Sequence, residues 1–297
     1  MRAQATPEGE LAGARVLVTG ATSGIGLATA RHFARRGAAV IGVGRDVERS
    51  SRARALVDAA ALAGGAPEPR FELADLSLMS SVADLAGRLA EQPGGLDIVA
   101  HVAGYYSDRR RLSAEGIELQ WAVNHLAPFA LTLRLLPLLE GRRRPKILVV
   151  SSESHYFGRI RWSDTSRRWA YVGILAYAQS KLANVLFVRE LHRRYGERID
   201  SFAVDPGLVD TEVGGKHASG LTRLFWSMRS AAGDPPELPA SLIVHLAAAA
   251  ELDGRGGRYW RDRAERQPSA RALEESAATR LWALSEAQIA RALERRS

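Results

Sequence analysis

A glycine-rich turn directly follows the first apolar run of this chain and opens straight into an amphipathic segment. The apolar run covers residues 15–19, the turn residues 19–26 and the amphipathic segment residues 24–36. A strand that bends sharply into a helix needs glycine where φ is positive or where the backbone approaches a ligand closely. The turn therefore predicts phosphate binding at the N-terminus of the helix, with Gly24 and Gly26 allowing the close approach.

The first two-thirds of the chain alternates between short apolar runs and helical segments. The predicted strands are residues 15–19, 39–43, 70–74, 97–102, 146–151 and 199–204. The predicted helices are residues 24–36, 47–62, 77–90, 114–139 and 174–195, the third with Ser77 as its N-cap. Nearly continuous apolar strands separated by amphipathic helices indicate a parallel sheet covered on both faces. The predicted fold class is α/β, as a Rossmann-type doubly wound parallel sheet.

The last third of the chain departs from this alternation. Residues 208–239 carry Gly and Pro around a cluster of large apolar side chains, which are Leu221, Leu224, Phe225, Trp226 and Met228. A helix at 239–250, a strand at 257–260 and a C-terminal helix from residue 270 follow. With no internal repeat or linker, we predict one domain over residues 1–297, in which 208–239 is an inserted segment and the helix from 270 is an extension.

Composition excludes several functions. The chain has no cysteine, which excludes disulfides, thiolate metal sites and a cysteine nucleophile, and no other metal site is predicted. Its net charge of +8 allows nucleic-acid binding as a weak alternative, but only three of 41 basic residues are lysine and the arginines are scattered, as on a solvated surface. Because it lacks a secretory signal and a run of ~18–20 apolar residues, we expect a cytoplasmic protein without a membrane span.

The end of the second predicted strand bears on which dinucleotide binds. NAD enzymes usually carry an acidic residue there, but this chain has Gly44, followed by Arg45 and Asp46. A guanidinium pairs bidentately with a phosphate, so Arg45 favours NADP, and NAD is the alternative cofactor. The simpler interpretation of Arg45 is a surface arginine without a role in binding. Asp46 is expected to face the helix start. Asp75, after the third strand, either contacts the adenine or caps the helix near Ser77.

Tyr177 and Lys181 are the candidate reacting groups. Residues four apart share one helix face, and an adjacent ammonium lowers the pKa of a phenol from its ordinary value near ~10. Tyr177 is then usable as an acid or base in reversible carbonyl reduction. Ser151 and Ser152 end the fifth strand, where a hydroxyl can polarise a carbonyl oxygen. Asn124 lies within a predicted helix and is expected to hold a water that links Lys181 to solvent.

These motifs resemble the short-chain dehydrogenase/reductase family over almost the full chain, and its retinol-dehydrogenase-like branch best. The matching stretches are 19–26, Arg45-Asp46, 124–126, 150–152 with His155, 177–184, 205–207 with Thr211-Glu212, 257–260 and 281–285. The resemblance implies a catalytic tetrad of Asn124, Ser152, Tyr177 and Lys181, with Ser152 rather than Ser151 as the serine. It implies a cofactor site made of Gly20, Thr22, Ser23, Gly24, Ile25, Gly26, Arg45, Asp75, Leu76, Ala103, Gly104, Tyr177, Lys181, Pro206, Gly207, Val209 and Thr211.

Two departures from the family pattern stand out. His101-Val102 replaces the usual Asn-Asn before Ala103-Gly104, which weakens the expected support of the sheet centre. Asp205 stands where His or Asn often precedes the Pro-Gly pair. Neither His101 nor His155 lies in a cluster of carboxylates, so packing or hydrogen bonding is the expected role of both.

The resemblance implies that residues 208–239 form a lid over the substrate. The apolar cluster of this segment, with Tyr105 and Tyr106 across the cleft, favours a lipophilic substrate, although an ordinary core or a subunit contact explains it equally well. We expect an NADP-dependent oxidoreductase that interconverts a carbonyl and an alcohol on a small lipophilic substrate. The alternative is a non-catalytic, nucleotide-sensing scaffold of the same fold. Members of the family are often dimers or tetramers, so a homo-oligomer is one of the expected states of this chain.

Overall fold

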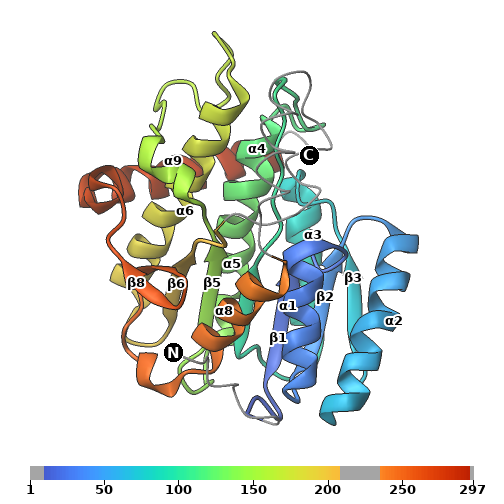
Figure 1. The fold of residues 1–297 in the computed structure, drawn as a ribbon. Coiled ribbons are helices and arrows are strands. Elements are labelled where there is room, and N and C mark those ends of the chain that lie inside the picture. The colour runs from blue at the N-terminus through green and yellow to red at the C-terminus, as the bar shows by residue number, and fades with distance from the viewer. Residues whose placement is uncertain (1–9, 208–234, 295–297) are drawn as a thin grey trace.

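The central sheet of the protein has eight strands in the order β3-β2-β1-β4-β5-β6-β7-β8 (Figure 1). The computed structural model describes residues 10–207 and 235–294. All neighbouring strands pair in parallel except β7 and β8, which are antiparallel. The strands are β1 (Arg15–Thr19), β2 (Ala39–Gly44), β3 (Arg70–Leu73), β4 (Ile98–His101), β5 (Lys146–Val150), β6 (Asp200–Val204), β7 (Arg258–Arg261) and β8 (Ala264–Arg266). The predicted fold class is therefore confirmed.

Helices cover both faces of this sheet. One face carries α1 (Gly24–Arg35), α2 (Val47–Gly64) and α8 (Glu237–Ala248). The other carries α3 (Met79–Ala90), α5 (Ala127–Leu139), α6 (Gly173–Tyr195) and α9 (Glu275–Glu294). Each face has its own apolar core, and β1 contributes to both because Val16 and Val18 point to one side while Leu17 points to the other. This double burial explains why the strand sequences are continuously apolar.

The strand order places the functional edge of the sheet. The chain moves outward from β1 through β2 to β3, then returns to β4 on the other side of β1. In open sheets of this kind, the crevice at the carboxyl ends of the strands around such a reversal binds ligands. The ends of β1, β2, β4, β5 and β6 therefore bring the predicted site residues to one edge.

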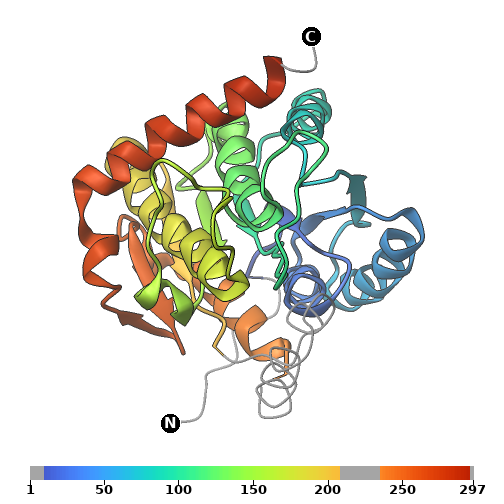
Figure 2. The ribbon, with the colours of Figure 1, turned by 90° about the horizontal axis from the view of Figure 1, so that it is seen from above.

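Helix α9 lies across the outside of α5 and α6, as the view from above shows (Figure 2). Two hydrogen bonds join it to the irregular turn η1 (Ala122–Leu126), which is a π-helix, and to the short helix α4 (Leu119–Trp121) before it. Ser285 Oγ lies 2.9 Å from Nε2 of His125, and Trp121 Nε1 donates to Oε1 of Gln288 over 2.8 Å. The C-terminal helix thus supports the segment that carries Asn124.

Two helix starts differ from the sequence prediction. Ser77 is not an N-cap, because α3 begins at Met79 and the backbone N–H groups of Met79 and Ser80 donate to the carboxylate of Glu115. The helix expected from residue 114 begins at Leu119, where Glu118 caps α4 by accepting from the backbone of Gln120 and Trp121. Carboxylate caps thus set both starts, and the cap of α3 comes from a residue 36 positions away.

The remaining predicted elements lie within a few residues of their expected places. The C-terminal helix predicted from residue 270 begins with a 3-10 turn, η4 (Ala270–Leu273), before α9. Strand β8 was not predicted. Among the described residues, one helical stretch, Leu119–Leu139, is long and apolar enough to cross a membrane, but 67% of it is buried inside the fold, where it forms core.

Candidate active site

The glycine turn after β1 is closely packed and has no room for a side chain at Gly20 or Gly26. A Cβ on Gly20 would lie 2.8 Å from Cα of Ala103, and one on Gly26 would lie 2.1 Å from the carbonyl oxygen of Gly20. Gly20 and Gly24 also have positive φ, of 69° and 51°. Ser23, the N-cap of α1, makes no side-chain cap bond, so the first N–H groups of α1 have no side-chain acceptor there. A close backbone and an uncapped helix N-terminus fit a pyrophosphate.

The end of β2 lies beside this turn. Asp46 is the N-cap of α2 and accepts from the backbone N–H of Arg49 over 2.8 Å, which confirms its predicted orientation toward the helix. A Cβ on Gly44 would lie 2.3 Å from Oγ of Ser50 and 2.5 Å from a methyl group of Thr22. An acidic side chain therefore cannot occupy position 44 without a shift in this packing. Arg45, directly after β2, is exposed.

Four other residues predicted to contact the cofactor lie after β3 and β4. Oδ1 of Asp75 accepts from the backbone N–H of Ser77 over 2.9 Å, so Asp75 orders the loop before α3, next to the half-buried Leu76. Ala103 and the exposed Gly104 follow β4. Their position is fixed by Thr19, whose hydroxyl oxygen accepts from the N–H groups of Val102 and Ala103 over 3.0 and 3.2 Å.

His101, at the first position of the departure from the family's Asn-Asn pair, has a hydrogen-bond partner within the fold. Its Nε2 lies 2.8 Å from the hydroxyl of Thr132 on α5, and burial lowers the pKa of the imidazole to about 3. The side chain is therefore a neutral hydrogen-bonding group that ties the sheet centre to α5. This is the structural role that the sequence favoured.

Tyr177 and Lys181 lie together on α6, next to the end of β5. The Tyr177 hydroxyl hydrogen-bonds the Ser152 side chain, and Nζ of Lys181 lies 5.4 Å from the centroid of the Tyr177 ring. That ammonium donates to the carbonyl oxygen of Val150 over 2.9 Å. Lys181 is only 2% exposed, and burial lowers its pKa to about 8.

The expected effect of Lys181 on the Tyr177 phenol is not the dominant one in this structure. Desolvation raises the pKa of Tyr177, the negative charge of Asp205 raises it further, and the hydrogen bond with Ser152 lowers it. The Lys181 ammonium donates to the Val150 carbonyl, and desolvation is the largest influence on the pKa of Tyr177. The phenol of the cofactor-free protein is therefore a proton donor.

The two serines after β5 have different surroundings. Ser151 is buried, and its hydroxyl donates to the carbonyl oxygen of Lys181 over 2.8 Å, which fastens β5 to α6. Ser152 is half-buried and forms the N-cap of η2 (Glu153–Phe157), accepting from the Ser154 N–H over 3.2 Å. The side chain of Ser152 also hydrogen-bonds to Tyr177.

Asn124 lies within the π-helical turn η1, which interrupts the helix predicted over this region. Its Oδ1 accepts from the N–H of Tyr105 over 2.7 Å, while its Nδ2 donates to the carbonyl of Tyr105 and to Oγ of Ser180. The amide group therefore binds the loop after β4 to α6, next to the Tyr177 turn. Its protein partners make it a clamp between these two elements.

The loop after β6 completes the part of the site that the structure describes. Asp205 is buried, and Pro206 and Gly207 are half-buried, with Gly207 at φ +72°. Val209 and Thr211, predicted to contact the cofactor, lie outside the described residues. The same holds for residues 208–234 of the predicted lid, whose last residues, 235–239, include the start of α8.

Two contacts were not foreseen from the sequence. The ring of Tyr106 meets that of Tyr177 edge to face, with 5.8 Å between centroids, and Tyr106 is buried. His155 Nε2 accepts from the Ser269 N–H over 3.1 Å, so its proton lies on Nδ1, which donates to the carbonyl of Ser152 over 2.8 Å. A histidine three residues after the serine is the sequence signal for the second contact.

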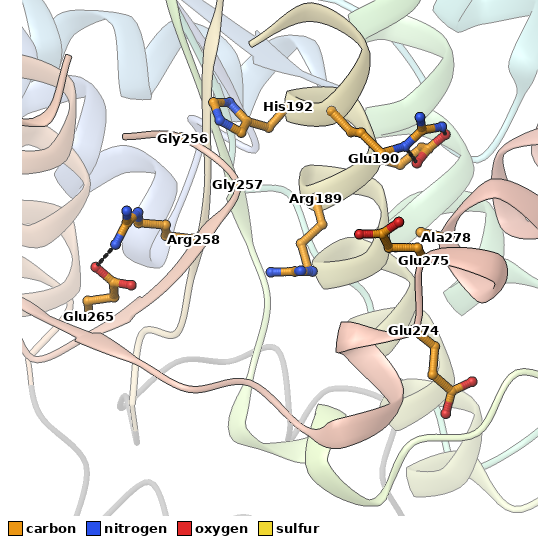
Figure 3. Close-up of a pocket in the computed structure, with 11 residues that line it drawn as sticks. Arg189, Glu190, His192, Gly256, Gly257, Arg258, Glu265, Glu274, Glu275 and Ala278 are labelled. Atoms are coloured by element: carbon orange, nitrogen blue, oxygen red, sulfur yellow. Dashed lines mark hydrogen bonds and ion pairs between the residues drawn. The ribbon is translucent and has the colours of Figure 1, made fainter. Parts of the chain in front are cut away.

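A separate cavity of about 420 Å³ lies between α6, β7, β8 and the start of α9 (Figure 3). Its charged side chains largely neutralise each other, since Glu190 pairs with Arg193 and Arg258 pairs with Glu265. None of the predicted site residues lines it. The cavity is therefore distinct from the edge of the sheet described above.

Comparison with known proteins points to one family. The family profile described as short chain dehydrogenase matches residues 14–221. The chain is 37% identical to a mouse polyprenol dehydrogenase, covering 90% of this chain and 81% of the relative. It is 35% identical to human retinol dehydrogenase 14, covering 95% of this chain and 88% of the relative.

Solved structures show the same likeness. An uncharacterized protein from Mycobacterium paratuberculosis is 31% identical to this chain, with a TM-score of 0.73. The match covers 94% of each of the two chains. A short chain dehydrogenase from Escherichia coli CFT073, complexed with NADPH, is 26% identical with a TM-score of 0.65, covering 86% of this chain and 98% of that one.

Proposed function

This chain belongs to the short-chain dehydrogenase family and is an NAD(P)-dependent oxidoreductase acting on CH–OH groups, and from that premise we propose that it uses NADP to interconvert a carbonyl and an alcohol on a small lipophilic substrate, with Tyr177 as acid and base. The observation that carries the proposal is the grouping of Tyr177, Ser152 and Lys181 at the edge of the sheet that also holds the glycine turn.

Each residue of the group has a role that follows from its contacts. A nicotinamide cofactor, when bound, supplies the hydride for reduction. Ser152 donates a hydrogen bond to the substrate oxygen beside Tyr177, and the Tyr177 hydroxyl delivers a proton to the same oxygen. The buried Lys181 ammonium stabilises the phenolate that results. Asn124 holds the loop of Tyr105 against α6, which keeps the helix face of Tyr177 in place.

The lipophilic substrate is supported by the aromatic lining and by the relatives. The Tyr106 ring meets that of Tyr177 edge to face, and Asn124 holds the backbone of the preceding residue, Tyr105. The relatives reported above are named for retinol and polyprenol, which are long apolar alcohols. An apolar wall next to the reacting hydroxyl would bind such a chain and exclude water from the proton transfer.

The proposal is tested by following NADPH absorbance with a panel of lipophilic aldehydes and ketones, and NADP⁺ reduction with the matching alcohols. Turnover with at least one pair is expected. The alternative, a non-catalytic nucleotide-sensing scaffold, predicts NADPH binding by calorimetry without turnover on the whole panel. That second result would overturn the enzymatic proposal.

The preference for NADP makes a separate prediction about Arg45. In Arg45→Ala, the Kd for NADPH is expected to rise about tenfold, because one charge-assisted pair with the 2′-phosphate is lost. The Kd for NADH should stay within about twofold, since NADH has no such phosphate. Fluorescence titration measures both constants.

Arg52→Ala is the matched control, because Arg52 is also exposed but lies within α2, where it pairs with Glu48. It should leave both constants unchanged. An equal rise for NADPH and NADH in Arg45→Ala would contradict the assignment of Arg45 to the 2′-phosphate.

A further inference from the structure

A buried carboxylate stands directly behind the reacting groups, at the place where the family often has His or Asn. Asp205 follows β6, and its side chain is only 1% exposed. Isolated carboxylates are rarely buried this deeply, because removal from water is costly unless the charge is compensated. The partners of Asp205 therefore indicate what its charge does.

Hydrogen bonds hold both oxygens of this carboxylate. Oδ1 accepts from the N–H of Gly207 over 3.0 Å, which fixes the turn through Pro206. Oδ2 accepts from the Tyr259 hydroxyl on β7 and lies 3.9 Å from a guanidinium nitrogen of Arg261. Asp205 thus joins the turn after β6 to the end of β7.

The same partners reach the turn of the catalytic serine. The Tyr259 ring packs against His155 with 4.6 Å between centroids, and His155 donates to the Ser152 carbonyl. Arg261 also lies 3.3 Å from the carboxylate of Glu153, the residue after Ser152. A path of direct contacts therefore leads from Asp205 to the backbone of Ser152.

The strand register brings Asp205 close to Lys181 as well. Lys181 donates to the carbonyl of Val150, and Val150 pairs with Val204, which directly precedes Asp205. The negative charge of Asp205 raises the pKa of Lys181 against the larger lowering caused by burial. The titratable and charged groups around the two side chains are Tyr177 of α6, Glu153, His155 and Tyr156 of η2, Tyr259 and Arg261 of β7, and Asp262.

We propose that Asp205 is a positioning residue of this active site: its buried carboxylate is the counter-charge that keeps Lys181 an ammonium, and it holds the turn after β6 against the turn of Ser152. The role in catalysis rests on the proposed function, whereas the pairing of charges does not. A neutral residue at position 205 would keep the turn and lose the counter-charge. Asp205→Asn makes this change with the smallest alteration in shape.

The chain offers a direct way to observe Lys181, since it has only three lysines, Lys146, Lys181 and Lys216. With lysine labelled with ¹³C at Cε, an NMR titration follows each ammonium, and the Lys181→Arg spectrum assigns the signal. In the native protein the Lys181 signal is expected to titrate near the pKa of about 8. In Asp205→Asn the midpoint should fall by about one pH unit, a tenfold lower ratio of ammonium to amine.

Tyr259→Phe is the matched control, because it removes the hydroxyl donated to Asp205 and leaves the charge. Its Lys181 midpoint should stay within about 0.3 pH units of the native one, because the interaction between the Asp205 carboxylate and the Lys181 ammonium is unchanged. An unmoved midpoint in Asp205→Asn overturns the proposal, and so does an equal fall in both variants, which would mean that packing sets the titration. If Asp205→Asn does not fold, Asp205→His, neutral above its own titration, replaces it in the same experiment.

The pH profile of turnover then connects the charge to catalysis. The alkaline limb of kcat/KM should follow the Lys181 midpoint in the native enzyme and move to lower pH with it in Asp205→Asn. A limb that stays in place while the midpoint moves overturns the catalytic part of the proposal. Absence of turnover in the native protein would refute the proposed function alone, because the NMR titration needs no substrate.

Discussion

Replacement of Tyr177 by Phe is expected to lower kcat for carbonyl reduction by about 10²–10⁴-fold, the range that a positioned general acid contributes. The variant keeps the ring, its edge-to-face contact with Tyr106 and its place beside Lys181. It removes only the hydroxyl that bonds to Ser152. The Kd for NADPH should therefore change by less than about threefold. Stopped-flow absorbance and fluorescence titration measure the two quantities.

Tyr156→Phe is the control for the loss of a tyrosine hydroxyl near the site. Tyr156 lies on η2, and its hydroxyl donates to the carbonyl of Gln267 over 2.6 Å, away from the reacting group. Its kcat should stay within a few-fold of the native value. Native turnover in Tyr177→Phe would remove the assignment of the acid, whatever the control shows.

Gly26→Ala is the second change with a large expected effect, and it acts on the cofactor site and on the fold together. A Cβ at position 26 would lie 2.1 Å from the carbonyl oxygen of Gly20, so the glycine turn must move. Such overpacking costs about 1–3 kcal/mol of stability and lowers Tm by several degrees, roughly 2–4 °C per kcal/mol. Because the displaced turn is the one that approaches the pyrophosphate, NADPH binding should become undetectable by fluorescence titration.

Gly87→Ala separates this effect from glycine replacement in general. Gly87 is an exposed helical residue of α3, and an added Cβ there meets nothing within 4 Å. Alanine is the better helix former by about 0.5–1 kcal/mol, so Tm should rise slightly and NADPH binding should be native. Native binding of NADPH by Gly26→Ala would show that the turn does not hold the cofactor.

The parts of the fold that were predictable from the sequence are those that local patterns determine. The strand at Arg15–Thr19 has the predicted bounds, because a strand buried on both faces must be apolar along its whole length. The glycine turn was recognisable because its conformation excludes most side chains. Tyr177 and Lys181 were brought together by helix periodicity alone.

What the sequence did not show depends on contacts between distant residues. The start of α3 is set by the carboxylate of Glu115, which no pattern near Ser77 indicates. The π-helical turn at Asn124 is held by Tyr105 and Ser180, so a helix was predicted without its irregular turn. The pKa of Tyr177 depends on desolvation and on Asp205, which is why a reading of Tyr177 and Lys181 alone expected the opposite direction.

The bonds from α9 to the Asn124 turn have a consequence for biosynthesis. Ser285 and Gln288 lie 160 and 167 residues beyond their partners His125 and Trp121. On a ribosome, the glycine turn and the first strands emerge long before these two residues do. The nucleotide half of the molecule can therefore begin to fold during translation, while the turn that carries Asn124 gains these two braces only after residue 288 has been made.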